Sequence, residues 1–179
     1  MSKINLLKEI AFQLRQDIIR MTAIAGSGHP GGSLSAVDFL TVLYFHQLTH
    51  NPKKPDWEGR DRVIFSKAHI TPAIYSVLAR AGYFDPKELV TFRQLNSRLQ
   101  GHPGKNKGLP GIEISGGSLG QGLSVAVGLA LGLRERVKHG FLKTEKNTNK
   151  ENVPQKFSDK IPYIYSINGD GELQEGSIW

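Results

Sequence analysis

The stretch Ile161-Pro-Tyr-Ile-Tyr-Ser-Ile167, followed directly by Asn168-Gly-Asp-Gly171, decides the fold prediction. Its apolar and β-branched residues predict a core strand, and a proline near the start of a strand is tolerated. A second short run, Arg62-Val-Ile-Phe-Ser66, predicts another buried strand. Apolar residues three and four apart, as at residues 4–21 and 37–48, predict helices before and between these strands. Strands that alternate with helices predict an α/β fold with a parallel sheet.

Three further helices are predicted over residues 71–82, 85–95 and about 119–137, because turn-forming residues precede each apolar pattern. Residues 139–160 are polar and rich in lysine, so we expect them to form an exposed excursion from the domain. The excursion carries part of the net charge and none of the motifs described below.

Composition limits the classes of function. The chain has 179 residues, of which 39% are apolar, and it has no cysteine, which excludes disulfides, thiolate nucleophiles and iron–sulfur or zinc–thiolate sites. No apolar run reaches membrane-spanning length, so we expect a cytoplasmic protein without a membrane partner. The net charge of +7 allows phosphorylated ligands or a nucleic-acid partner. Because no aromatic residues alternate with the lysines, we expect no nucleic-acid partner.

Glycine is enriched and clustered, which predicts loops that turn sharply or touch a ligand. Two of the clusters contain the same tetrapeptide, Gly28-His-Pro-Gly31 and Gly101-His-Pro-Gly104. A further histidine, His69, follows the predicted strand at 62–66. A single His-Pro turn is ordinary loop chemistry. Its repetition, together with a histidine at a strand end where α/β sheets bind ligands, favours a functional site.

Two other segments offer contacts to anions or metals. Asp170, between glycines at the end of a predicted strand, suits Mg²⁺, although an ordinary Asp-Gly turn explains it equally. Ser115-Gly-Gly-Ser-Leu-Gly-Gln-Gly122 opens a helix and is either an anion or cofactor site or a tight packing loop. Glu172 and Glu175 follow Asp170, and three acids this close could form a metal cluster. We expect Glu172 to be a solvated surface acid and its replacement by alanine to matter little.

In this order and spacing, the segments resemble the N-terminal, thiamine-diphosphate-binding part of transketolase. The likeness is greatest to the N-terminal subunit of transketolases that are split into two chains. It implies a parallel-sheet fold with flanking helices over residues 1–179, cut off on its C-terminal side. The matching segments are 27–31, 61–69, 101–103, 118–122 and 169–176.

The resemblance implies a binding site for thiamine diphosphate and Mg²⁺. Asp170 would bind the metal, and Gly171 would contact the cofactor diphosphate. Gly117, Ser118 and Leu119 would line the cofactor, with Leu119 against the thiazolium ring.

The resemblance also implies catalytic roles. His69 would reach both the cofactor diphosphate and the substrate. His29 and His102 would hydrogen-bond the sugar donor and acceptor and help to move protons. Glu175 would join an acid network between the two active sites of a dimer.

The chain departs from the family pattern at several positions. Ala68 stands where the family usually has glycine, Gly116 where threonine is common, and Ser118 where longer members often have proline. The family's magnesium-binding asparagine and the glutamate that activates the aminopyrimidine are absent from these 179 residues. We therefore expect the chain to be inactive alone. It would act with more chain or with a C-terminal transketolase half, in a homo- or hetero-oligomer.

The implied reaction is transfer of a two-carbon ketol unit between ketose and aldose phosphates. One alternative is a non-catalytic binding or scaffolding subunit of the same fold, and another is an enzyme like deoxyxylulose-phosphate synthase. Retention of His29, His69, His102 and Asp170 favours a catalytic protein. The paired Gly-His-Pro motifs and Gln174-Glu-Gly176 favour transketolase over the synthase.

Overall fold

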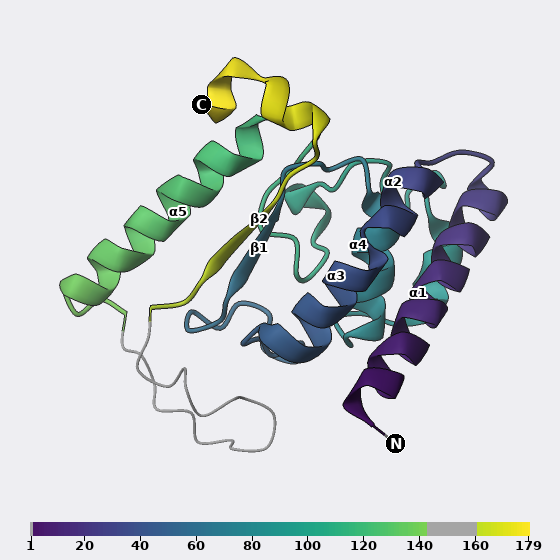
Figure 1. The fold of residues 1–179 in the computed structure, drawn as a ribbon, viewed down its shortest axis with the longest axis horizontal. Helices are drawn as coiled ribbons and strands as arrows, with labels where there is room; N and C mark the ends of the chain where they lie inside the picture. The colour runs from purple at the N-terminus through teal and green to yellow at the C-terminus, as the bar shows by residue number, and fades with distance from the viewer. Residues whose placement is uncertain (1, 143–160) are drawn as a thin grey trace.

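The computed structural model describes residues 2–142 and 161–179. A parallel pair of strands separates one group of helices from a single helix on the other side (Figure 1). The part of the chain that the structure describes contains no helix with the length and apolarity needed to span a membrane. In chain order the elements are α1 (Lys3–Ala25), α2 (Pro30–Ser35), α3 (Val37–Val42), β1 (Arg62–Phe65), α4 (Thr71–Arg80), α5 (Gln121–Lys138) and β2 (Ile164–Ile167). Shorter helical turns are η1 (Leu43–Gln47), η2 (Pro86–Thr91), η3 (Lys105–Lys107), η5 (Gly171–Gln174) and η6 (Gly176–Ile178).

The two strands run parallel, with Arg62 opposite Ile164 and Phe65 opposite Ile167. The pairing continues one step further, because the Lys67 N–H donates to the Ile167 carbonyl at 3.1 Å. Both strands therefore end at the same edge of the sheet. The predicted α/β fold and parallel pairing are confirmed, although β2 begins at Ile164 and not at residue 161.

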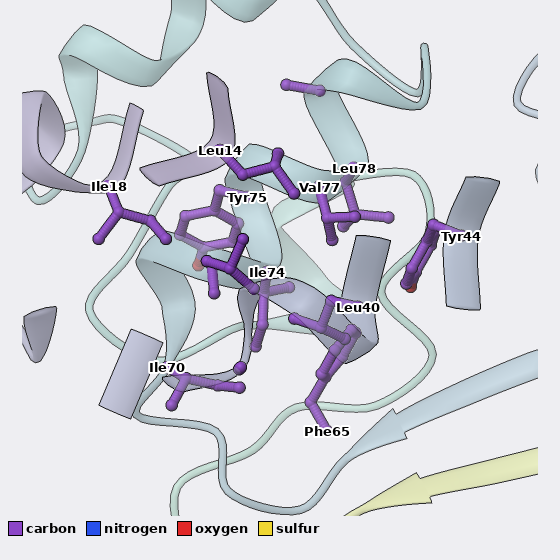
Figure 2. Packing of buried hydrophobic residues seen from close by; sticks show 14 of the residues in the cluster. Leu14, Ile18, Leu40, Tyr44, Phe65, Ile70, Ile74, Tyr75, Val77 and Leu78 are labelled. Carbon is purple, nitrogen blue, oxygen red and sulfur yellow. The ribbon is translucent and has the colours of Figure 1, made fainter. Parts of the chain in front are cut away.

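The two faces of β1 pack against different layers because successive side chains point in opposite directions. Val63 and Phe65 belong to the main core cluster, formed with α1, α3 and α4. Figure 2 shows Phe65 beside Leu40, with Ile74 of α4 between the strands and α1. Ile64 is fully buried but lies outside that cluster, on the face covered by α5.

The helical layer is fixed by an ion pair with a buried carboxylate as well as by apolar packing. Asp17 of α1 is 5% exposed and accepts two hydrogen bonds from the Arg80 guanidinium of α4, at 2.7 and 2.8 Å. The apolar face predicted for the first helix is buried from Ala11 to Met21, whereas Ile4 is exposed near the chain end. Together these contacts hold α1 against α4.

The segment predicted as a helix over 85–95 differs from the expectation. It forms only the 3-10 turn η2, capped by Asp85, whose carboxylate accepts from the Lys87 N–H at 2.9 Å. Arg93 and Asn96 then adopt positive φ angles, which are incompatible with a continuing helix. Residues 143–160, most of the excursion predicted at 139–160, lie outside the described residues.

Candidate functional site

The predicted site residues converge on the edge where both strands end. Residues 66–69 leave the sheet after β1, and residues 168–171 leave it after β2. The two segments are close, since a Cβ placed on Gly169 would lie 3.6 Å from Cδ of Lys67. Asp170 and Gly171 are exposed, and a Cβ on Gly171 would meet nothing within 4 Å. This edge therefore presents an accessible carboxylate next to open space.

Two of the predicted histidines lie side by side. His29 directly precedes α2, and its ring centroid is 5.3 Å from that of His69, with the planes at 64°. Gly32 of α2 packs beside the same segment, since a Cβ there would lie 3.3 Å from the Ile70 side chain and 3.6 Å from Nε2 of His69. The packing of α2 on the segment after β1 thus brings residues from two separate motifs together.

The second Gly-His-Pro turn is anchored by α4. The Thr71 hydroxyl donates to the Gly101 carbonyl at 2.9 Å, and the Tyr75 hydroxyl donates to the Gln100 carbonyl at 2.8 Å. Two ring carbons of His102 lie 3.9 Å from where a Cβ on Gly117 would be. The third histidine is therefore next to the glycine-rich segment predicted to line the cofactor.

His69 is the half-buried histidine among the three, while His29 and His102 are exposed. Burial lowers the pKa of His69, and His29 and Lys67 nearby lower it further. The neutral imidazole is favoured, so this side chain can accept a proton or a hydrogen bond near neutral pH.

A cavity of about 180 Å³ lies between the end of β1 and the beginning of α5. Gly122 allows this close approach, because a Cβ on it would lie 2.5 Å from Cβ of Ser66. The cavity is lined by residues that include Ser66, Gly116, Gly117, Ser118 and Gln121. Leu119, which follows Ser118 in sequence, is 41% exposed.

Two of the positions that depart from the family pattern are in contact. A Cβ on Gly116 would lie 2.5 Å from Cβ of Ala68, which is fully buried. The Gly116 N–H also donates to the Pro103 carbonyl at 3.0 Å. The loop after β1 therefore packs against the loop before α5 at this point, where the methyl group of Ala68 occupies the space that a side chain at position 116 would need.

A buried ion pair that no sequence motif indicates supports the same wall. The Arg60 guanidinium donates to both carboxylate oxygens of Glu113 at 2.8 and 2.9 Å. Their side chains are only 10% and 13% exposed. This pair ties the loop before β1 to the segment that leads into Gly116.

Glu172 differs from the expectation of a solvated surface acid. The residue is only 1% exposed. Its carboxylate accepts from the Ser66 hydroxyl, from the Gly120 N–H and from the Gly169 N–H. The glycine before α5 offers no side-chain cap, so the start of this helix needs an acceptor from elsewhere, but that requirement does not indicate which residue supplies it.

Glu175 is exposed and lies beside the turn that precedes α5. A Cβ on Gly120 would be 2.9 Å from Cβ of Glu175, and Gly120 has φ of +83°, so both space and backbone conformation require glycine there. The structure thus places Glu175 next to the Leu119–Gly120 turn.

The carboxylates at the sheet edge are compatible with a metal ion that a phosphorylated ligand also helps to bind. Within residues 2–142 and 161–179, no group of three or more His, Asp or Glu side chains could hold an ion, so the acid cluster considered from the sequence is not formed. Glu172 instead faces protein donors. Mg²⁺ is commonly held by one or two carboxylates plus phosphates and water, and the exposed Asp170 provides one such carboxylate.

Comparison with known proteins agrees with this arrangement. The chain is 36% identical over 178 residues to the transketolase of Homo sapiens, covering 99% of this chain and 25% of that protein. It is also 36% identical over 178 residues to the 6-deoxy-6-sulfo-D-fructose transketolase subunit SqwG of Clostridium sp. (strain MSTE9), covering 96% of this chain and 56% of that subunit. The solved transketolase from Leishmania mexicana superposes with a TM-score of 0.81 at 32% identity, covering 96% of this chain and 24% of that one.

The chain spans from about a quarter to about half the length of the curated relatives it matches. The family model described as transketolase, thiamine diphosphate binding domain, matches residues 7–178. That match extends over nearly the whole sequence, and the chain therefore belongs to the transketolase family.

Proposed function

We propose that this chain is the cofactor-binding N-terminal part of a thiamine-diphosphate-dependent transketolase. It would transfer a two-carbon ketol unit from a ketose phosphate to an aldose phosphate. The observation that carries the proposal is the convergence of three histidines from separate motifs on the sheet edge that also presents Asp170. A scaffolding subunit would have no need of this arrangement.

The glycine-rich edge would hold the cofactor. Asp170 would bind Mg²⁺ next to the diphosphate, and the open surface at Gly171 would let backbone N–H groups approach the diphosphate oxygens. Gly117, Ser118 and Leu119 would line the rest of the cofactor. When bound, thiamine diphosphate supplies the electron sink that allows the ketose carbon–carbon bond to break.

The histidines would position the sugars and move protons. His69, whose pKa is lowered, would hydrogen-bond in its neutral form to the diphosphate and the substrate hydroxyls. His29 and His102 would orient the donor and acceptor sugars from the two Gly-His-Pro turns. Glu175, beside Gly120, would extend an acid network towards a second active site in a dimer.

The proposal includes a C-terminal partner. The Clostridium relative is named as a transketolase subunit, and this chain covers 56% of it. A C-terminal transketolase half would supply the pyrimidine-binding domain and the glutamate that activates the aminopyrimidine. The chain alone would then be inactive. The assembly would act in the cytoplasm as a homo- or hetero-oligomer.

The test is reconstitution. This chain, and a version extended beyond Trp179, is mixed with a candidate C-terminal half, and consumption of xylulose 5-phosphate is measured with and without thiamine diphosphate and Mg²⁺. We expect turnover only when the partner, the cofactor and the metal are all present. Absence of cofactor-dependent turnover in every combination would refute the catalytic proposal.

A further inference from the structure

We infer that Glu172 is a positioning residue, which fixes the cofactor-binding loops of the proposed site without touching the metal or the cofactor. The inference rests on the proposed function. It starts from the observation that this acid is buried although it lies two residues after Asp170, which is exposed. Within the described residues, its carboxylate accepts hydrogen bonds from one side-chain hydroxyl and two backbone N–H groups.

The Glu172 carboxylate joins two segments that are distant in sequence to the turn that directly precedes it. Oε1 accepts from the Ser66 hydroxyl at 2.6 Å and from the Gly120 N–H at 2.9 Å. Oε2 accepts from the Gly169 N–H at 2.8 Å. These donors are 106, 52 and 3 residues away from Glu172 in the chain.

Each of the three donors lies within three residues of one proposed to bind the cofactor or the substrate. Ser66 begins the segment that carries His69, and it lines the cavity. Gly120 directly follows Leu119, and Gly169 directly precedes Asp170. One carboxylate therefore sets the spacing between the metal-binding turn and the two other walls of the site.

A carboxylate is needed because two of the donors are backbone N–H groups that cannot reverse their role. In a Glu172→Gln variant, one oxygen becomes an NH₂ group. If the NH₂ takes the Oε2 position, it faces the Gly169 N–H; if it takes the Oε1 position, it faces the Gly120 N–H. Only the Ser66 hydroxyl can rotate to accept. In either orientation, the glutamine NH₂ therefore faces a backbone N–H group, and that pair cannot form a hydrogen bond.

The predicted role is distinct from metal binding. Both carboxylate oxygens already accept hydrogen bonds inside the protein, and the side chain is 1% exposed, so no face of it is available to an ion at the open edge. Loss of the carboxylate should therefore weaken cofactor binding by displacing the Gly169–Asp170 turn and the Leu119–Gly120 turn. It should also speed exchange of the Gly120 and Gly169 amide hydrogens, which a surface acid would not affect.

The experiment compares wild type, Glu172→Gln and Asp17→Asn, each assembled with the C-terminal partner. Asp17→Asn is the matched control, because it also removes a buried carboxylate held by protein donors, but between α1 and α4, away from the site. Calorimetry gives the Kd of thiamine diphosphate at saturating Mg²⁺, and NMR gives amide exchange. We expect Glu172→Gln to raise the Kd about tenfold or more, the loss typical of a hydrogen bond to a charged group. Asp17→Asn should leave it within about twofold while lowering the Tm.

The outcomes separate the two proposals. If wild type binds no thiamine diphosphate with Mg²⁺, the proposed function fails and the positioning role fails with it. If wild type binds and Glu172→Gln binds equally tightly, with unchanged exchange at Gly120 and Gly169, only the positioning role is overturned. If Glu172→Gln does not fold, Ser66→Ala carries the test, since it removes one donor and keeps both backbone contacts. An unchanged Kd in Ser66→Ala would then overturn the inference, and a Kd raised severalfold would support it.

Discussion

Replacement of Gly116 by alanine tests the fit between the two loops that cross beside the cavity. The added Cβ would lie 2.5 Å from Cβ of Ala68, about 1 Å closer than carbon atoms normally approach. Ala68 is fully buried, and the added Cβ would also lie 3.6 Å from Pro103 and 3.5 Å from the Phe65 carbonyl, so neither loop can yield freely. Gly116 does not have a positive φ angle, so the contact alone decides the effect. We expect Gly116→Ala to lower the free energy of unfolding by about 1–3 kcal/mol, the usual cost of overpacking.

The compensating variant makes the reasoning refutable. Ala68→Gly alone should cost about 1–2 kcal/mol, from loss of one buried methyl and from added backbone freedom in the unfolded chain. In the double variant Ala68→Gly/Gly116→Ala the overlap disappears, so the combined loss should be smaller than the sum of the single losses by about 1–3 kcal/mol.

The assay is urea unfolding followed by the fluorescence of Trp57 and Trp179. Gly128→Ala is the control, because a Cβ there would meet nothing within 4 Å and alanine favours the helix α5, so stability should stay the same or rise by up to about 1 kcal/mol. The reasoning is wrong if the losses in free energy of unfolding of the two single variants sum to that of the double variant within about 0.5 kcal/mol, because residues 68 and 116 would then not interact.

Three other predictions concern the metal, a buried ion pair and pH. Asp170→Ala should abolish Mg²⁺-dependent binding of thiamine diphosphate in the assembled enzyme, measured by calorimetry, and retained affinity would show that this carboxylate is not the ligand. Glu113→Ala leaves the buried Arg60 guanidinium without its partner, so urea unfolding should show a loss of about 3 kcal/mol; a loss below about 1 kcal/mol would mean that solvent screens the pair. Burial lowers the pKa of His50 from its ordinary 6.5, so the unfolded state takes up the proton first, and stability should decline as the pH falls below 6.5 and level off below the folded pKa. His50→Gln should reduce that slope but not remove it, because the pKa of His69 is lowered as well, and an unchanged slope would contradict the assignment.

The hydrophobic periodicity and the positions of the strand ends were enough to predict the parallel strand pair and the sheet edge at which the candidate site lies. The two apolar runs became a parallel pair, and that pairing alone places His69 and Asp170 at one edge. The two Gly-His-Pro turns lie near other predicted site residues, since the His29 ring is 5.3 Å from that of His69 and the His102 ring lies next to Gly117; the functional role that the repeat favours stays a prediction. These features are local, or they follow from the rule that parallel strands end together.

The sequence could not predict contacts whose partners are far apart along the chain. The acceptor for the Gly120 N–H comes from 52 residues later, and the Arg60–Glu113 pair spans 53 residues. Nothing in the local pattern distinguishes a glutamate that turns inward from one that faces water. The Glu172 error therefore arose from tertiary packing, which overrides the usual exposure of charged residues.

The span of the Ser66–Glu172 hydrogen bond has a consequence for the order of events during synthesis. The helices α1 to α4 precede residue 81, and α1 and α4 can pair as soon as both have emerged. Ser66 and its acceptor are 106 residues apart, which at ribosomal speed is roughly 5–20 s of translation. Throughout that interval the helical layer can be folded while the wall around Ser66 and Gly120 still lacks its acceptor. The edge proposed to bind the cofactor is thus completed late, and a nascent chain that includes α4 but ends before Glu172 should have a native-like helical layer without a complete site.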